Sequence, residues 1–312
     1  MTEERDGDDS DIDVFETASS GQTADSDGRW VDLPHANLLS VEDADDLLRW
    51  RSASVVAIVG ERNGGKTTLV TELYERYLRG PFADYLFTHC LSSMGFELKT
   101  FESRADSGAD TPDTPRTSKQ DGLKFFHLAL SSSSELVRTD LLISERAGEA
   151  YRDVRDHPSG APELLEVRKA AKVVFILDGE RVADPLRRTE AIASIRHLAR
   201  AFSDTGAAPP SAELQLVTTK WDLLNSAQMV AARDVLAAFE SQFVTAYERR
   251  YAKVSVFHVA ARDPKGELEA AYGLAPLLQS WLQPHAPSEK PEGSPTPVLL
   301  DEFDKLLVRR VG

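Results

Sequence analysis

Cysteine is nearly absent from this sequence of 312 residues, in which Cys90 is the only one. A single cysteine cannot form a disulfide within the chain, and it fits a reducing compartment. The seven histidines are scattered, so they give no zinc-binding spacing. No apolar run approaches the roughly 20 residues that cross a bilayer, and the acidic start does not resemble a signal peptide. We therefore expect a cytoplasmic protein without zinc or a membrane span.

Positive charge is scarce at the N-terminal end. The chain has a net charge of −15, from 51 acidic residues against 36 Lys and Arg. Up to Asp46 there are 15 acidic and 2 basic residues, a net of −13, which leaves −2 for residues 47–312. Phosphate backbones require a basic surface, so this balance argues against nucleic acid as a partner.

Three parts of the chain are poor in large apolar side chains. Residues 1–30 predict a disordered acidic tail, because they cannot bury enough surface to fold. Residues 102–122, rich in Pro, Ser, Thr and Asp, predict a long loop inside the domain. Residues 285–297 predict a linker to a short C-terminal helix at 298–312. The segment between them, 31–284, is expected to form the globular domain.

Short apolar, β-branched runs alternate with segments of helical periodicity. The runs predict strands at 54–59, 123–130, 136–144, 173–177, 214–217 and 254–259. The periodic segments predict helices at 67–78, 185–202, 226–251 and 274–282. Six strands that alternate with helices predict a three-layer α/β fold with a mostly parallel six-stranded sheet.

The strongest motif has the form G-x-x-x-x-G-K-[ST] and reads Gly60-Glu61-Arg62-Asn63-Gly64-Gly65-Lys66-Thr67. It lies between a predicted strand and a predicted helix. Its glycines allow backbone N–H groups to surround phosphate oxygens at the start of the helix. Lys66 can reach the outer phosphates, and the Thr67 hydroxyl can bind Mg²⁺. We predict nucleotide contacts from Gly60, Asn63, Gly64, Gly65, Lys66, Thr67 and Thr68.

The choice of base depends on Thr219-Lys220-Trp221-Asp222, which follows a predicted buried strand. The Asp222 carboxylate can accept hydrogen bonds from guanine N1–H and from the exocyclic amine, and adenine lacks this pair of donors. Lys220 can lay its methylene stem along the base, and Thr219 belongs to the same site. The motif predicts guanine, although Asp222 could equally cap the next helix.

The order of these motifs resembles the translation-factor-related class of P-loop GTPases, which includes the Ras-like proteins. It looks closest to the bacterial double-GTPase branch, whose members belong to multi-gene conflict or signalling systems. The resemblance covers about residues 54–284. It implies a Ras-like P-loop NTPase fold, GTP and GDP as ligands, Mg²⁺, and a protein partner that could be a second GTPase of the same system.

Members of this class carry D-x-x-G after a strand, and the matching residues here are Glu145-Arg146-Ala147-Gly148. The resemblance implies that Glu145 holds Mg²⁺ through water and that the Gly148 N–H binds the γ-phosphate. Glu145 is one methylene longer than the usual Asp, and the segment could also be the start of a surface helix. Ala260 and Ala261 resemble a loop that contacts the guanine oxygen, and they could equally be a plain exit from the last strand.

Residues beside these motifs bear on hydrolysis. Glu149 stands where Ras-like enzymes have Gln, and its charge predicts slow turnover. Arg62 replaces a small residue and could face the phosphates or the solvent. In the long loop, Arg116 could act as a cis arginine finger, and Thr117, with Thr114 as the alternative, could complete the Mg²⁺ shell. Lys66, Glu149 and Arg116 are thus the candidate catalytic residues of a slow GTPase switch. The alternative is a nucleotide-binding scaffold with little or no hydrolysis.

Overall fold

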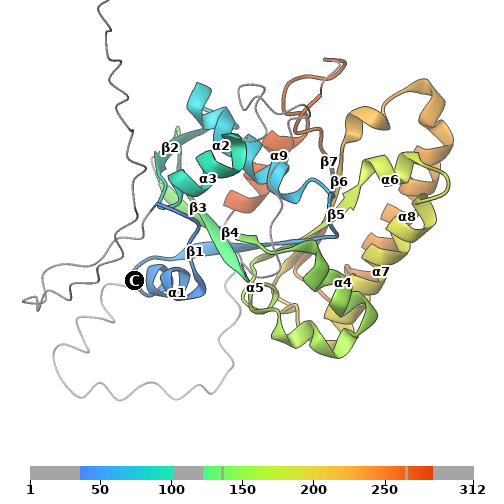
Figure 1. Ribbon diagram of the computed structural model, residues 1–312, viewed down its shortest axis with the longest axis horizontal. Helices are drawn as coiled ribbons and strands as arrows, with labels where there is room; N and C mark the ends of the chain where they lie inside the picture. The colour runs from blue at the N-terminus through green and yellow to red at the C-terminus, as the bar shows by residue number, and fades with distance from the viewer. Residues whose placement is uncertain (1–35, 102–121, 135–136, 264–265, 284–312) are drawn as a thin grey trace, which may run out of the picture. The chain divides into compact units, whose positions relative to one another are not determined.

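A seven-stranded sheet forms the centre of the described part of the chain (Figure 1). The computed structural model describes residues 36–101, 122–134, 137–263 and 266–283. The strand order is β2-β3-β4-β1-β5-β6-β7. The strands are β1 Ala53–Val59, β2 Tyr85–His89, β3 Lys124–Ser132, β4 Arg138–Glu145, β5 Lys172–Asp178, β6 Glu213–Thr219 and β7 Lys253–His258. β3 is antiparallel to both of its neighbours, and the other pairs are parallel.

Helices cover both faces of this sheet (Figure 1). The α-helices are α1 Val41–Trp50, α2 Lys66–Arg79, α3 Ser93–Phe101, α4 Gly148–Asp156, α5 Leu165–Arg168, α6 Gly179–Ala183, α7 Arg188–Thr205, α8 Val230–Tyr247 and α9 Leu274–Leu282. One core contains side chains from α2, α3 and α9, and a second contains side chains from α4, α7 and α8. The predicted three-layer, mostly parallel α/β fold is confirmed.

The central strand β1 shows why the sequence produces this arrangement. Its side chains alternate between the two cores, with Val56 and Ile58 in one and Ala57 and Val59 in the other. A strand with helices on both faces has no solvent-facing side, so it reads as a continuous apolar run. The same holds for β5, in which every residue is buried.

The predicted count of six strands is wrong, because β2 was not foreseen. This strand lies at the edge of the sheet and pairs only with β3, with a shift of register between Phe87 and His89. Three of its five residues are exposed. A short edge strand buries too little to require the apolar run or strict alternation by which a strand is recognised in a sequence.

The parallel strands place the predicted motifs at one edge of the sheet. β1 leads into Gly60, β5 ends at Asp178 and β6 ends at Thr219, and these are the carboxyl ends of three adjacent strands. Ligands of open α/β sheets bind at this edge. In the described ranges, every helix is too short or too polar to cross a bilayer.

Several predictions fall outside the described residues. They concern the acidic tail at 1–30, Arg116 and Thr117 in the long loop, the linker at 285–297 and the helix at 298–312.

Candidate functional site

The phosphate loop occupies the turn between β1 and α2. Two of its residues have a left-handed backbone, Asn63 with φ 62° and Gly65 with φ 84°. Glycine adopts this conformation freely, and asparagine is among the side-chain-bearing residues that tolerate it best. Left-handed residues beside right-handed ones turn successive N–H groups toward one point, which is how backbone concavities bind anions. The loop thus has the local geometry that its glycine-rich sequence predicts.

Lys66 lies inside this loop. Its Nζ donates to the carbonyl oxygens of Gly60 at 2.9 Å and of Glu61 at 2.8 Å. Burial lowers the pKa of the Lys66 ammonium to about 8, although the nearby carboxylates of Glu145, Glu149 and Glu61 oppose this shift. A buried cation held mainly by neutral carbonyl groups is incompletely compensated, and the phosphates of a nucleotide would supply the missing negative charge.

The two predicted metal ligands within the described chain lie in contact. The Thr67 Oγ1 donates to Glu145 Oε1 at 2.8 Å, and the Glu145 side chain is buried. Thr67 is the second residue of α2 and Glu145 is the last residue of β4, so the fold brings together residues 78 positions apart. A hydroxyl and a carboxylate are hard oxygen ligands of the kind that Mg²⁺ prefers, so this pair fits the ion that the motif implies.

The segment after β4 packs directly on the phosphate loop. A Cβ added to Gly148 would lie 2.6 Å from the Glu61 carbonyl carbon, so only glycine fits at this close approach. The preceding Arg146 is held from the other side by two bonds to the buried Glu166, at 2.6 and 3.1 Å. The sequence analysis missed this pair. The segment that was predicted to contact the γ-phosphate is therefore fixed against the loop at its backbone and anchored by its side chains.

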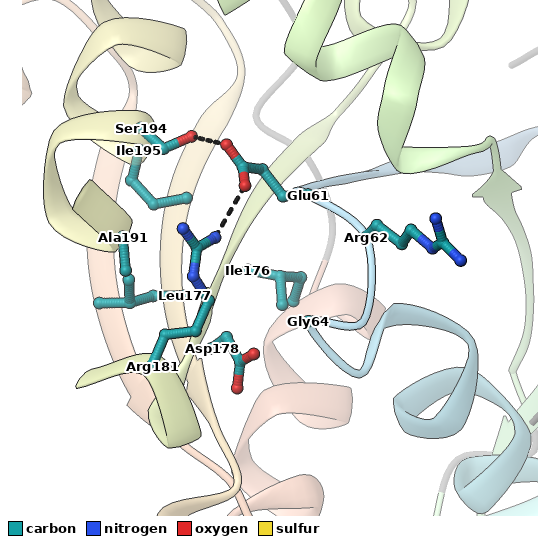
Figure 2. A pocket seen from close by; sticks show the side chains of 10 residues that line it. All are labelled: Glu61, Arg62, Gly64, Ile176, Leu177, Asp178, Arg181, Ala191, Ser194 and Ile195. Carbon is teal, nitrogen blue, oxygen red and sulfur yellow. Dashed lines mark hydrogen bonds and ion pairs between the residues drawn. The ribbon is translucent and has the colours of Figure 1, made fainter. Parts of the chain in front are cut away.

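Arg62 and Glu149 face each other across this contact. Arg62 Nη1 lies 3.9 Å from Glu149 Oε1, and both side chains are about 40% exposed, at 42% and 39%. Figure 2 shows Arg62 extending away from the side chains that surround Glu61. The Arg62 side chain is therefore partly exposed to solvent and points toward Glu149, the residue that was predicted to influence hydrolysis.

The predicted guanine motif touches the phosphate loop. The Thr219 Oγ1 donates to the carbonyl oxygen of Gly64 at 2.8 Å, across 155 positions of the chain. Asp222 is half-buried in a short 3-10 helix, η4 Trp221–Leu223, three residues beyond this contact. Asp222 and Lys66 therefore lie at the same edge of the sheet, as binding of one nucleotide by both requires.

Lys220 has a left-handed backbone, with φ 51°, and a paired side chain. Its Nζ lies 3.1 Å from Asp178 Oδ1 and 2.6 Å from Glu180 Oε2. Burial alone would lower the pKa of the Lys220 ammonium, but its bonds to Glu180 and Asp178 outweigh burial and raise it. These carboxylates keep the lysine charged and fix its side chain beside the end of β5.

The ends of β6 and β7 are joined beside this motif. Trp221 stacks on His258 with the ring centroids 3.8 Å apart and the planes at 2°, so Trp221 serves packing. The N–H of Ala260 donates to the carbonyl of Tyr272 at 3.0 Å. Because that N–H is already used within the protein, Ala261 is the better of the two predicted contacts to the guanine oxygen.

Glu61 is the most heavily engaged residue of the loop, and the sequence analysis gave it no role. Its buried carboxylate accepts from Arg155 at 2.5 Å, Arg181 at 2.7 Å and Ser194 at 2.5 Å, as Figure 2 shows for the last two. These bonds hold the pKa of the Glu61 carboxyl below its usual value, although burial opposes them. The partners lie 94, 120 and 133 positions away, so no local pattern could reveal them.

Comparison with known families decides the membership of the chain. The sequence profile of Double-GTPase 2 matches residues 54–282, a span that contains the phosphate loop, Glu145–Gly148 and Thr219–Asp222. The chain belongs to the Double-GTPase 2 family. As a Double-GTPase 2 protein it is a P-loop GTPase, and the predicted resemblance to the double-GTPase branch is confirmed. No curated protein matches the chain.

Solved GTPase structures show distant similarity to this Double-GTPase 2 chain. The Roco2 RocCORdC protein of Methanosarcina barkeri bound to GDP is 13% identical, with 74% of this chain and 49% of that chain covered and a TM-score of 0.36. The signal recognition particle receptor SRb-GTP/SRX complex of Chaetomium thermophilum is 15% identical, with 74% of this chain and 97% of that chain covered and a TM-score of 0.39. The Ski7 GTPase-like domain of S. cerevisiae, bound to GDP and inorganic phosphate, is 14% identical, with 77% of this chain and 52% of that chain covered and a TM-score of 0.40. The chain thus spans about half the length of the first and third.

Proposed function

We propose that the protein is a slow, Mg²⁺-dependent GTPase whose conformation depends on the γ-phosphate of GTP. The observation that carries this proposal is the convergence of three separate motifs at one edge of the sheet. The Thr67–Glu145 bond joins the phosphate loop to the end of β4, and the Thr219–Gly64 bond joins it to the guanine motif. One nucleotide can contact all three motifs only if they meet in this way.

Nucleotide binding should change the hydrogen bonds of Lys66. Phosphate oxygens carry the negative charge that the Gly60 and Glu61 carbonyls lack, so Lys66 exchanges these carbonyls for phosphate. Thr67 and, through water, Glu145 would hold Mg²⁺, with Thr117 of the long loop as a further ligand. When bound, the ion neutralises charge on the β- and γ-phosphates.

Slow hydrolysis follows from the residues beside the γ-phosphate position. Glu149 can orient a water molecule, but its carboxylate also brings negative charge toward a phosphate that is already negative. Arg62 offsets only part of this charge, since the pair is separated by 3.9 Å and both partners are partly exposed. We assign Arg116 as a cis arginine that stabilises the transition state.

Phosphate release from purified protein with Mg²⁺ tests the proposal. We expect binding of GTP and GDP in preference to ATP, and slow release of phosphate from GTP alone. Intact GTP binding with no release above the buffer rate would instead establish a nucleotide-binding scaffold. Preferred binding of ATP would remove the assignment of Asp222 to the base.

Two substitutions test the roles in hydrolysis. Glu149→Gln should raise the single-turnover rate, because it keeps a water-orienting group and removes the charge, whereas the exposed Glu163→Gln should not change it. Arg116→Ala should lower the same rate with nucleotide affinity unchanged. Equal rates for Arg116→Ala and the unaltered protein would remove Arg116 from the mechanism.

We also propose that the triphosphate state binds a second GTPase of the same system. The exposed Met94, Leu98 and Phe101 on α3 recur at helical spacing, and such a surface suits a protein partner. Size-exclusion chromatography of the two purified GTPases should show a complex with a GTP analogue and not with GDP. Separate elution in both states would contradict the proposal.

A further inference from the structure

Glu61 connects the phosphate loop to the helices around it. Its carbonyl oxygen accepts from Lys66, so its backbone belongs to the phosphate site. Its carboxylate extends away from that site and accepts from Arg155 of α4, Arg181 of α6 and Ser194 of α7. One residue therefore joins the phosphate-binding backbone to three separate helices, and Figure 2 shows the bonds to Arg181 and Ser194.

Each of the two arginines also has a second carboxylate partner. Arg155 binds Asp156, its exposed neighbour on α4, at 2.8 Å, and Arg181 lies 3.2 Å from Glu190. If α4 moved away, Glu61 would keep Arg181 and Ser194, and Arg155 would keep Asp156. Breaking a buried ion pair is costly when it leaves a charge without a partner, and here it would leave none. The bond from α4 can thus open without leaving a charge unpaired, and what distinguishes α4 from α6 is the segment that it carries.

The same helix carries the segment that was predicted to contact the γ-phosphate. α4 begins at Gly148, whose backbone packs against the loop at Glu61 and Arg62. Arg155 follows about two helical turns later and reaches the same loop through its side chain. α4 is therefore docked on the phosphate loop at two points, through the backbone of Gly148 and through the side chain of Arg155.

We infer that Arg155 is a positioning residue that holds α4 docked on the phosphate loop and thereby favours GTP over GDP. This inference rests on the proposed function, in which Gly148 contacts the γ-phosphate. GDP lacks that phosphate and gains nothing from a docked α4. A contact that stabilises the docked state therefore adds to the affinity for GTP and leaves that for GDP nearly unchanged.

The test compares Arg155→Met with Arg152→Met, which removes an exposed arginine from the same helix. Affinities for GDP and for a non-hydrolysable GTP analogue are measured with Mg²⁺ by calorimetry. We expect Arg155→Met to lower the ratio of analogue affinity to GDP affinity by about 5- to 20-fold, within the usual range of coupling between sites. Arg152→Met should leave the ratio unchanged, and Arg155→Lys should restore part of it.

Arg181→Met serves as a second reference. It removes a bond from α6, which does not carry the segment predicted to contact the γ-phosphate, so it should disturb the loop itself and weaken both ligands by similar factors. If Arg155→Met also weakens both ligands equally, or changes neither, Arg155 is only structural and the inference is overturned. Should Arg155→Met fail to fold, the ratio measured for Arg155→Lys decides in the same way. If the unaltered protein binds neither ligand, the proposed function fails and the inference falls with it.

Discussion

The phosphate loop and the guanine motif meet at one edge of the sheet, but the protein holds them differently. The loop is tied to α4, α6 and α7 through the buried Glu61, and its buried Lys66 is bound by two backbone carbonyls. The guanine motif is a single 3-10 turn with a half-buried Asp222 and a Lys220 fixed by two carboxylates. We expect this difference to separate two properties, with the loop governing affinity for any nucleotide and the turn governing which base is accepted.

Removal of the loop cation should have the largest effect. Lys66→Ala removes the charge that faces the phosphates, so we expect affinity for GTP and GDP to fall by about 100-fold or more. Lys253→Ala, at an exposed position on β7, should leave affinity unchanged. Fluorescence titration with labelled nucleotide measures both. Retained binding in Lys66→Ala would mean that the loop does not govern affinity.

The burial of Lys66 should lower the stability of the protein in a pH-dependent way. The pKa of the Lys66 ammonium is about 8 in the folded protein, against about 10.4 in an unfolded chain, so the folded state binds its proton less well. Below pH 8 this cost is fully present, and it is relieved as the pH rises from 8 toward 10.4. The free energy of unfolding, relative to Lys66→Met, should therefore increase over this window by up to about 3 kcal/mol. Urea titrations at pH 7 and pH 10 measure the increase, and a constant difference would contradict it.

A change in the base motif should alter the choice of ligand and spare the phosphate contacts. Asp222→Asn replaces an acceptor of two N–H groups by an amide, so we expect GTP affinity to fall by about 10- to 100-fold and xanthosine triphosphate to become the better ligand. Competition between the two nucleotides measures this exchange. An unchanged preference for GTP would show that Asp222 does not read the base.

The smallest predicted effect lies where α4 meets the loop. Gly148→Ala places a methyl group against the backbone of Glu61 and Arg62, which cannot yield as a flexible side chain would. We expect affinity for a GTP analogue to fall about tenfold, with GDP less affected. Gly160→Ala is the control, because its nearest neighbour would be Val154 at an ordinary 3.8 Å. Equal losses for both nucleotides would place Gly148 in the general affinity of the loop.

The sequence revealed those parts of the site whose structure depends on neighbouring residues. Gly60–Thr67 forms its turn from its own glycines and asparagine, and β1 and β5 are continuous apolar runs because helices cover both faces. Both features leave a local pattern. The predicted α/β class and the location of the motifs at one sheet edge followed from these patterns.

Other features depend on contacts between distant positions, and they were missed. Glu61 looks like any variable residue of the loop until α4, α6 and α7 bring their donors to it. Arg146 finds Glu166 across 20 positions, and β2 is a strand only because β3 lies beside it. The charged residues that stabilise the site internally carry no periodic signal, so only the folded arrangement discloses them.

The bonds from Lys66 to Gly60 and Glu61 have a consequence for how the loop responds to an anion. The ammonium belongs to the first residue of α2 and binds two carbonyls at the end of β1, so one side chain ties the two ends of the turn together. A phosphate that binds this ammonium therefore acts on both ends of the turn at once.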